Sequence, residues 1–208
     1  MKILVVGGSG MIGSRIVAEA AARGHQVIAG ARHPEKIESS DNVSAVELDA
    51  TSADSIAQAA ADADAIVMTV SPRNGGNPSA EANAVADAAM AAAKNTGKRL
   101  FYVGGAGSLL LPDGSPVAET LPDEIKPEAI AMREVRDRLQ SSDLDWTVLC
   151  PPAMIQPGEK KGNYRLGTTA LMFNDNGESA ISAEDYSDAV LNELETPAHS
   201  RAQFTIAY

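Results

Sequence analysis

The sequence predicts an α/β fold in which a doubly wound parallel sheet carries helices on both faces. A short apolar run at Ile3–Val6 leads directly into the glycine-rich segment Gly7–Gly13, and a helical pattern follows it. Short apolar runs then recur along the chain, and segments with apolar residues at helical spacing separate most of them. Because parallel strands are covered on both faces and are connected through helices, this alternation indicates repeated β-α units.

The expected elements follow this alternation in order. The helical segment Met11–Arg23 is followed by Gly24, a residue type that commonly ends helices. Pro127 suits the first turn of a later helix, where its missing N–H group costs nothing. Strands are expected at Ile3–Val6, Gln26–Ala31, Val43–Leu48, Ala65–Val70, Arg99–Gly104 and Trp146–Cys150, and helices at Met11–Arg23, Ser52–Ala61, Ser79–Asn95 and Pro127–Gln140.

The alternation changes from Pro151 onward. A Gly/Pro/Lys loop comes first, and Ser182 is placed to cap a last helix. We therefore expect one domain, residues 1–208, in which residues 151–208 contribute a small C-terminal substrate lobe. Its expected elements are short strands at Tyr164–Leu166 and Ala170–Phe173, a turn at Asn174–Gly177, a helix at Ala183–Leu194 and a strand at Gln203–Ala207.

Composition excludes several classes of protein. With 17 Lys and Arg against 28 Asp and Glu, the net charge is −11, which argues against a general nucleic-acid or membrane-surface binder. The single cysteine, Cys150, excludes an internal disulfide framework, and no apolar stretch suggests a signal sequence or a membrane span. We therefore expect a cytoplasmic protein, and the acidic surface does not decide between monomer and homodimer. No metal-ligand spacing links His25, His33 and His199, so no metal site is expected.

The glycine spacing predicts a dinucleotide site at the end of the first strand. Gly7 allows a sharp turn, Gly10 lets the backbone approach a pyrophosphate, and Gly13 lets the helix pack closely on the strand. Free N–H groups at the start of the helix would hold the phosphates. A glycine-rich turn without a ligand is the alternative. The candidate residues here are Gly7, Ser9, Gly10, Met11, Ile12 and Gly13.

The residues that end the second and third strands indicate which dinucleotide binds. An NAD site usually places an acid at the end of the second strand, whereas this chain has Arg32 there. A charge-assisted hydrogen bond to a 2′-phosphate is worth about 1.5 to 3 kcal/mol, so Arg32 could favour NADP(H) roughly 10- to 100-fold. Asp49, with Ala50, lies on the adenine side of the expected crevice. The alternatives are a solvated Arg32 at a strand end and an Asp49 that only caps the following helix.

Several motifs together resemble the atypical short-chain dehydrogenase/reductases, specifically the NAD(P)H-binding, NmrA-like group that includes biliverdin reductase B and NADH-flavin reductase-like proteins. The motifs are Gly7-Gly-Ser-Gly-Met-Ile-Gly13, Tyr102-Val-Gly-Gly-Ala-Gly-Ser108, Lys126-Pro-Glu-Ala129, Leu144-Asp-Trp-Thr-Val-Leu-Cys-Pro-Pro152, Tyr164-Arg-Leu-Gly167 and Ile181-Ser-Ala-Glu-Asp-Tyr186. The resemblance covers nearly the whole chain and implies a Rossmann domain that binds NADP(H). It also implies that the nicotinamide lies among Val70, Ser71, Gly104, Gly105, Pro151, Pro152 and Met154.

The chain lacks the Tyr-x-x-x-Lys pair with which typical members of the wider superfamily protonate a developing alkoxide. Four positions beyond Tyr102, Tyr164 and Tyr186 stand Ala106, Thr168 and Val190, and Tyr208 is the last residue. Carbonyl reduction or sugar epimerisation by that mechanism is therefore disfavoured. Flavins and quinones need no strong acid, because their reduced forms take a proton from water or a weak donor.

The remaining candidates would contact such an acceptor. Ser108 follows the fifth strand and could hydrogen-bond an acceptor oxygen, or it is an ordinary loop serine. Lys126 could support a reduced acceptor by its charge, or it is a solvated residue at a helix start. Tyr164 and Arg165 could stack on or pair with a planar anion, or they pack the lobe.

We therefore expect an NADPH-dependent oxidoreductase that transfers hydride to a flavin or a related planar acceptor such as a quinone. The flavin would be a substrate rather than a bound prosthetic group. The alternative from a different class is a non-catalytic NADP(H)-binding redox sensor that acts through a protein partner. A nucleotide-sugar isomerase or epimerase is a third alternative, which the missing Tyr-x-x-x-Lys pair weakens.

Overall fold

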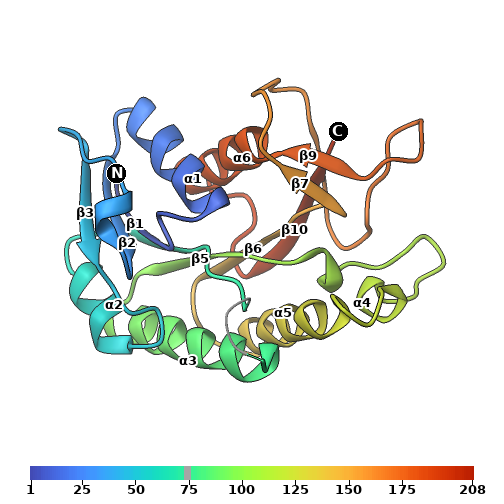
Figure 1. The fold of residues 1–208 in the computed structure, drawn as a ribbon, viewed down its shortest axis with the longest axis horizontal. Helices are drawn as coiled ribbons and strands as arrows, with labels where there is room; N and C mark the ends of the chain where they lie inside the picture. Colours follow the sequence, from blue (N-terminus) through green and yellow to red (C-terminus); the bar gives the residue numbers. More distant parts are fainter. Residues whose placement is uncertain (73–75) are drawn as a thin grey trace.

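The computed structural model describes residues 1–72 and 76–208. Its centre is an eight-stranded sheet in the order β3-β2-β1-β4-β5-β6-β10-β8, with a separate two-stranded ribbon, β7-β9 (Figure 1). Every neighbouring pair in the large sheet is parallel except β10 and β8. The strands are β1 (Lys2–Val6), β2 (Gln26–Ala31), β3 (Val43–Glu47), β4 (Ala65–Met68), β5 (Arg99–Val103), β6 (Trp146–Cys150), β7 (Met154–Gln156), β8 (Arg165–Gly167), β9 (Ala180–Ser182) and β10 (Ala202–Ala207).

Helices cover both faces of the sheet, so the molecule has three layers, as predicted for a doubly wound α/β fold. One apolar core, which includes Val5, Ile16 and Val190, joins the sheet to α1 and α6. The other, which includes Leu4, Val85 and Val135, joins it to α2, α3 and α5. The helices are α1 (Met11–Ala22), α2 (Ala53–Ala59), α3 (Pro78–Thr96), α4 (Val117–Thr120), α5 (Lys126–Gln140) and α6 (Ala183–Glu195), with 3-10 turns at Pro34–Lys36 and Ala106–Ser108.

The central strands are continuous apolar runs because both of their faces are covered. All four residues of β4 and all five of β6 are buried. Three helices begin at a residue whose side chain caps the N-terminus. Ser52, Asn77 and Ser182 each accept a hydrogen bond from a backbone N–H group of the helix that follows. The predicted cap at Ser182 is thereby confirmed.

The C-terminal segment, residues 151–208, contributes strands to the central sheet. β10 lies parallel to β6, and β8 pairs antiparallel with β10, so residues 151–208 complete the sheet as well as carrying the ribbon (Figure 1). The predicted strand at Ala170–Phe173 is wrong: Ala170 makes a single bridge to Leu110, and no ladder continues from it. The ribbon strands Met154–Gln156 and Ala180–Ser182 were not predicted, because each has three residues and pairs across a long separation in sequence.

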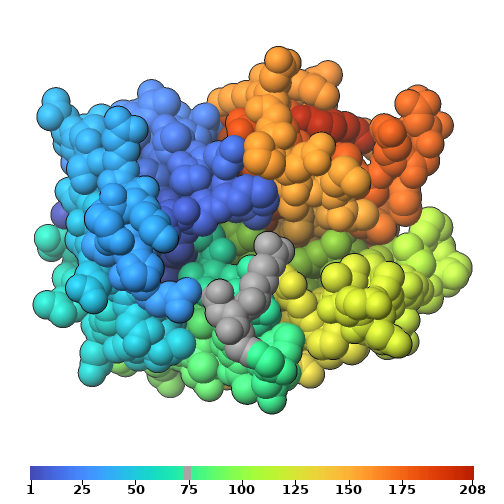
Figure 2. Space-filling view, viewed as in Figure 1, coloured from blue at the N-terminus to red at the C-terminus, as the bar shows by residue number. Residues whose placement is uncertain are grey.

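The parallel register sets the position of the loops. Because β1, β2, β4, β5 and β6 run in one direction, the segments that leave them emerge at one edge of the sheet. The space-filling view shows this side of the molecule, where the dark-blue and orange segments lie side by side above the green ones (Figure 2). Within the described residues, no helix is long and apolar enough to cross a membrane.

Candidate functional site

The glycine loop after β1 is held by the neighbouring strand. The amides of Gly7 and Gly8 both donate to the carbonyl oxygen of Gly30 on β2, at 2.8 and 3.0 Å. Gly7 has φ +89°, a conformation that side chains disfavour. A Cβ on Gly13 would collide with the carbonyl group of Gly7, so only glycine permits this approach of helix to loop.

Among the described residues, the amides at the start of α1 have no intrahelical or capping partner. Gly10 precedes the helix without a side-chain cap, and the first turn contains no acidic residue. The amide of Ser14 makes the first intrahelical bond, to the Gly10 carbonyl at 2.9 Å, which leaves the amides of the first three helical residues free of intrahelical partners. Ser9 and Met11 are exposed beside them, and Ile12 is half-buried. This arrangement fits a pyrophosphate.

Thr69, which the sequence analysis did not identify, holds the loop from the other side. Its hydroxyl donates to the carbonyl of Val6 at 2.8 Å and lies 3.2 Å from the carbonyl of Gly7. A Cβ on Gly7 would lie 2.5 Å from the Thr69 hydroxyl oxygen. A polar residue directly after a buried strand is the signal that could have identified it.

Arg32 and Asp49 come together at the ends of β2 and β3. Both are exposed, and Ala50 beside them is half-buried against the core. Asp49 accepts from the amide and hydroxyl of Thr51, at 2.9 and 2.7 Å. These two bonds, followed by the positive charge of Arg32, hold the pKa of Asp49 below its ordinary value. Asp49 therefore caps its own turn while remaining near Arg32.

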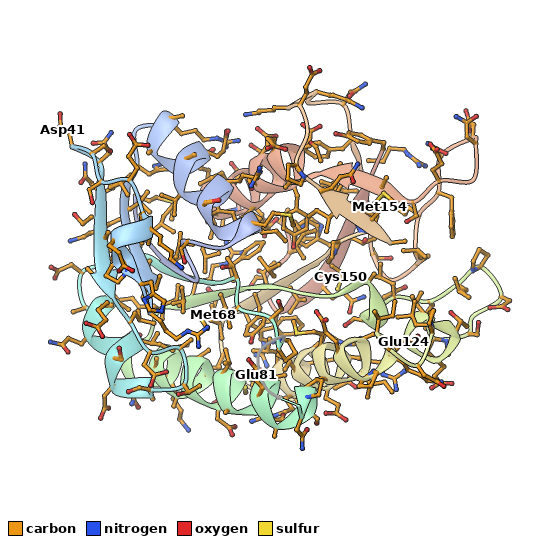
Figure 3. All side chains as sticks on the ribbon, viewed as in Figure 1. Asp41, Met68, Glu81, Glu124, Cys150 and Met154 are labelled. Atoms are coloured by element: carbon orange, nitrogen blue, oxygen red, sulfur yellow. The ribbon has the colours of Figure 1, made fainter. Side chains whose placement is uncertain are left out.

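The residues expected around the nicotinamide lie where β4, β5 and β6 end. Val70 and Ser71 follow β4, and both are half-buried. Gly104 is packed so closely that a Cβ would lie 2.8 Å from Val148 and 3.0 Å from the Cys150 sulfur, while one on Gly105 would lie 3.1 Å from Met132. Pro151 and Pro152 are buried after β6, whereas Met154 on the ribbon is 55% exposed; Figure 3 labels both Cys150 and Met154.

Ser108 lies in the 3-10 turn after β5 and is 4% exposed. Its hydroxyl lies beside the thiol of Cys150 but makes no hydrogen bond of regular geometry with any described residue. Burial raises the pKa of the Cys150 thiol to about 12, and the charge of Arg136 and the Ser108 hydroxyl offset this only in part. The thiol is therefore neutral, and the Ser108 oxygen is covered.

Lys126 lies at the start of α5 and lines a cavity of about 340 Å³. Its ammonium group donates to the carbonyl of Glu119 at 3.1 Å. The other residues that line the cavity are Asn77, Pro78, Ser79, Asp123, Pro127 and Ile130. Among the described residues, the cavity thus combines apolar walls with the Lys126 cation, the Asp123 carboxylate and two neutral polar side chains.

Tyr164 and Arg165 have partners in the C-terminal segment. The Tyr164 hydroxyl donates to Asp188 and accepts from Asn192, at 2.7 and 2.8 Å, and burial followed by Asp188 raises its pKa. Arg165 donates to the backbone carbonyl of Phe173 and to a terminal oxygen of Tyr208, at 2.7 and 2.6 Å. Neither residue lines the cavity at Lys126. These contacts correspond to the packing alternative.

The other three tyrosines offer no activated phenol. Tyr102 is buried, and burial raises its pKa; Tyr186 is fully buried and donates to the carbonyl of Leu149 at 2.6 Å. The ammonium of Lys161 lies over the ring of Tyr208, 4.2 Å from its centroid, while the Tyr208 hydroxyl donates to Asp185 at 2.7 Å. Burial, followed by the bond to Asp185, raises the pKa of Tyr208, and the bond from Ser182 offsets this only in part. Among residues 1–72 and 76–208, no cluster of three or more metal-ligating side chains occurs.

A family model described as NAD(P)H-binding matches residues 7–197, from the glycine loop to just beyond α6. A curated relative, the uncharacterized protein YwnB of Bacillus subtilis, is 35% identical, and the alignment covers 99% of this chain and 98% of the relative. Sequence similarity thus extends through the glycine loop and the C-terminal segment.

Solved structures agree over the same length. A Burkholderia pseudomallei protein, provisionally named as exported, is 40% identical with a TM-score of 0.89 and 100% coverage of both chains. A provisionally named epimerase from Bacteroides thetaiotaomicron is 34% identical with a TM-score of 0.92, covering 100% of this chain and 96% of the other. A provisionally named NADH-flavin reductase from Streptococcus pneumoniae is 28% identical with a TM-score of 0.83, covering 100% and 99%.

Proposed function

The chain belongs to the NAD(P)H-binding family, and from that premise we propose that it is an NADPH-dependent reductase of a flavin or a related planar acceptor such as a quinone. The observation that carries the proposal is a dinucleotide loop at a sheet edge where no tyrosine is placed as a proton donor. An acceptor whose reduced form takes its proton from water suits such a site. The name of the Streptococcus pneumoniae relative points to the same class of acceptor.

The preference for NADPH rests on Arg32. Its exposed side chain follows β2, where the ribose 2′ position of a bound dinucleotide lies in folds of this kind. Asp49 stands nearby, but its carboxylate accepts from Thr51. Arg32 is thus the charged group best placed to meet a 2′-phosphate.

Different parts of the site would bind the pyrophosphate, the nicotinamide and the acceptor. The free amides at the start of α1 would bind the pyrophosphate, and the packed glycines Gly104 and Gly105 let the backbone come close to the nicotinamide. The bound cofactor supplies the hydride. Lys126 would stabilise negative charge on the reduced acceptor, and the apolar walls of its cavity would exclude water from the ring.

A turnover assay tests the proposal. The purified protein is mixed with NADPH and with FMN, FAD, riboflavin or quinones, and loss of nicotinamide absorbance is followed. The Gly13→Ala variant is the matched control, because its Cβ would meet the Gly7 carbonyl and close the pyrophosphate loop. Turnover of at least one acceptor by the wild type alone is expected. Tight NADPH binding without turnover across the panel would contradict the reductase proposal.

A non-catalytic redox sensor is the second candidate, because the Ser108 hydroxyl is covered and cannot touch an acceptor in this conformation. A sensor would bind NADPH and report its redox state to a protein partner. The same assay separates the two candidates. Epimerisation, which the name of the Bacteroides thetaiotaomicron relative suggests for that protein, would need an acid–base pair that the tyrosines of this chain do not supply.

A further inference from the structure

Glu184, in the first turn of α6, accepts hydrogen bonds from two separate parts of the molecule. Its Oε1 lies 2.6 Å from Nε of Arg15 on α1. Its Oε2 lies 2.7 Å from the backbone nitrogen of Gly158, in the segment that follows β7. One carboxylate therefore joins α1 to residues 157–162.

Arg15 continues this connection to the dinucleotide loop. Its Nη1 donates to the carbonyl of Met11, the first residue of α1, at 2.8 Å. The side chains of Arg15 and Glu184 are each 27% exposed, so water screens the pair only in part. Burial raises the pKa of Glu184, but the bonds from Arg15 and Gly158 outweigh it and hold the pKa below its ordinary value.

The other anchors of residues 157–162 attach elsewhere. Asp185 is fully buried and accepts from the amides of Lys161 and Gly162, at 3.0 and 2.8 Å. Lys160 forms ion pairs with Glu19, in the third turn of α1, and with Asp188 on α6. Among the contacts of the described chain, the Glu184–Arg15 connection is the one that runs from this segment to the first turn of α1.

We propose that Arg15 and Glu184 are positioning residues that couple dinucleotide binding at the first turn of α1 to the ordering of residues 157–162. Helix ends fray, and a ligand that accepts from the first-turn amides would suppress fraying there. The Met11 carbonyl would then be fixed, and the planar guanidinium of Arg15 would transmit this to Glu184 and Gly158. The inference rests on the proposed function only in taking those amides as the pyrophosphate site.

The Glu184→Gln variant breaks this connection with little change in shape. The carboxylate accepts from two donors, Arg15 and Gly158, whereas a glutamine amide has one acceptor oxygen and one donor nitrogen. Glu184→Asp keeps both acceptor oxygens on a shorter stem and is the conservative rescue. Lys160→Gln is the matched control, since it removes an ion pair between the same segment and the same helix without touching the first turn.

Hydrogen exchange of residues 158–162, measured with and without saturating NADPH, tests the coupling. Coupling free energies of this kind correspond to about fivefold or more, so NADPH is expected to slow exchange by about that factor in the wild type and in Lys160→Gln. In Glu184→Gln the ratio of the exchange rate without NADPH to the rate with NADPH should fall to near one. In Glu184→Asp this ratio should recover in part. A variant that is merely destabilised would exchange faster in both conditions, so the ratio isolates the coupling.

Two results would overturn the inference. One is an NADPH effect on exchange that is equal in Glu184→Gln and wild type; the other is no effect in the wild type although NADPH binds. The NADPH effect on hydrogen exchange requires only that NADPH binds. A protein that binds NADPH but fails the turnover assay therefore still tests this inference. A protein that does not bind NADPH would overturn both proposals.

Discussion

The carbonyl group of Gly7 occupies the space that a β-carbon on Gly13 would need. The contact brings the first turn of α1, whose amides have no intrahelical partners, against the loop that follows β1. Two glycines six residues apart thus depend on each other, and Thr69 holds Gly7 from the opposite side. The glycine loop is therefore closely packed on both sides.

The Gly13→Ala variant is expected to lose NADPH binding and some stability. The added methyl group would meet the Gly7 carbonyl and lie 2.8 Å from the Thr69 hydroxyl, and overpacking of this kind costs about 1 to 3 kcal/mol. Thermal unfolding and an NADPH titration measure the two effects. Ser14→Ala, on the same exposed turn, is the control and should change neither. Unaltered NADPH affinity in Gly13→Ala would argue against this loop as the pyrophosphate site.

The Arg32→Asp variant is expected to reverse the cofactor preference. Loss of a charge-assisted bond to the 2′-phosphate should weaken NADPH binding by about 10- to 100-fold, and the new carboxylate should favour the ribose hydroxyls of NADH. Parallel titrations with NADPH and NADH measure the ratio, with Lys36→Gln as the nearby control. NADPH affinity that stays the same in Arg32→Asp would rule out this role.

The Tyr186→Phe variant is expected to lower stability without affecting turnover. The hydroxyl bonds the carbonyl of Leu149 inside the core, and the amide of Gly104 keeps bonding that carbonyl when the hydroxyl is gone. The free energy of unfolding should therefore fall by about 1 kcal/mol. Denaturant unfolding and steady-state kinetics check the two halves of the prediction. A large loss of turnover in a folded variant would instead identify Tyr186 as a proton donor.

The Lys126→Gln variant is expected to weaken binding of anionic acceptors only. A partly exposed charge contributes up to about 1 kcal/mol, so the KM for FMN should rise by up to about fivefold while that for uncharged riboflavin stays constant. Comparing the two acceptors in one variant separates charge from shape. Equal changes in KM for FMN and riboflavin would contradict this prediction, because they would show that the Lys126 charge does not meet the FMN phosphate.

Acid is expected to destabilise the protein through Glu193. This buried carboxylate accepts from Arg99 and from the ring and amide of His199, at 2.7 to 2.9 Å. Burial raises its pKa, but the His199 and Arg99 bonds outweigh burial and place the pKa below its ordinary value. Since the folded pKa is lowered, the stabilisation is complete above the unfolded pKa of about 4.3 and is lost as the pH falls below it.

Melting temperatures of the wild type and Glu193→Gln, measured from neutral pH downward, check this. The variant should be less stable at neutral pH and should lose less stability on acidification. Glu47→Gln, on the exposed side of β3, is the control. Identical acid profiles for Glu193→Gln and wild type would contradict the prediction.

Local spacing was sufficient for much of the fold. Continuous apolar runs predicted the buried central strands, and helical spacing with caps predicted α1, α3, α5 and α6 to within a few residues. The ribbon β7-β9 escaped prediction, because three-residue strands have too short a pattern and depend on a distant partner. The strand predicted at Ala170–Phe173 is wrong because this apolar run pairs with no neighbouring strand beyond the single bridge from Ala170 to Leu110.

By itself, the sequence determined the doubly wound sheet, the glycine loop and the missing Tyr-x-x-x-Lys pair, because each depends on residues close together in the chain. Tertiary structure decided what depends on distant partners. In the folded chain the Ser108 hydroxyl is buried beside Cys150, and the Tyr164 hydroxyl donates a hydrogen bond to Asp188. Arg15 pairs with Glu184, 169 positions away in the sequence. Spacing along the chain carries no information about such contacts, since they form only when segments far apart in the sequence pack against one another, as α6 packs on α1 to bring Glu184 to Arg15.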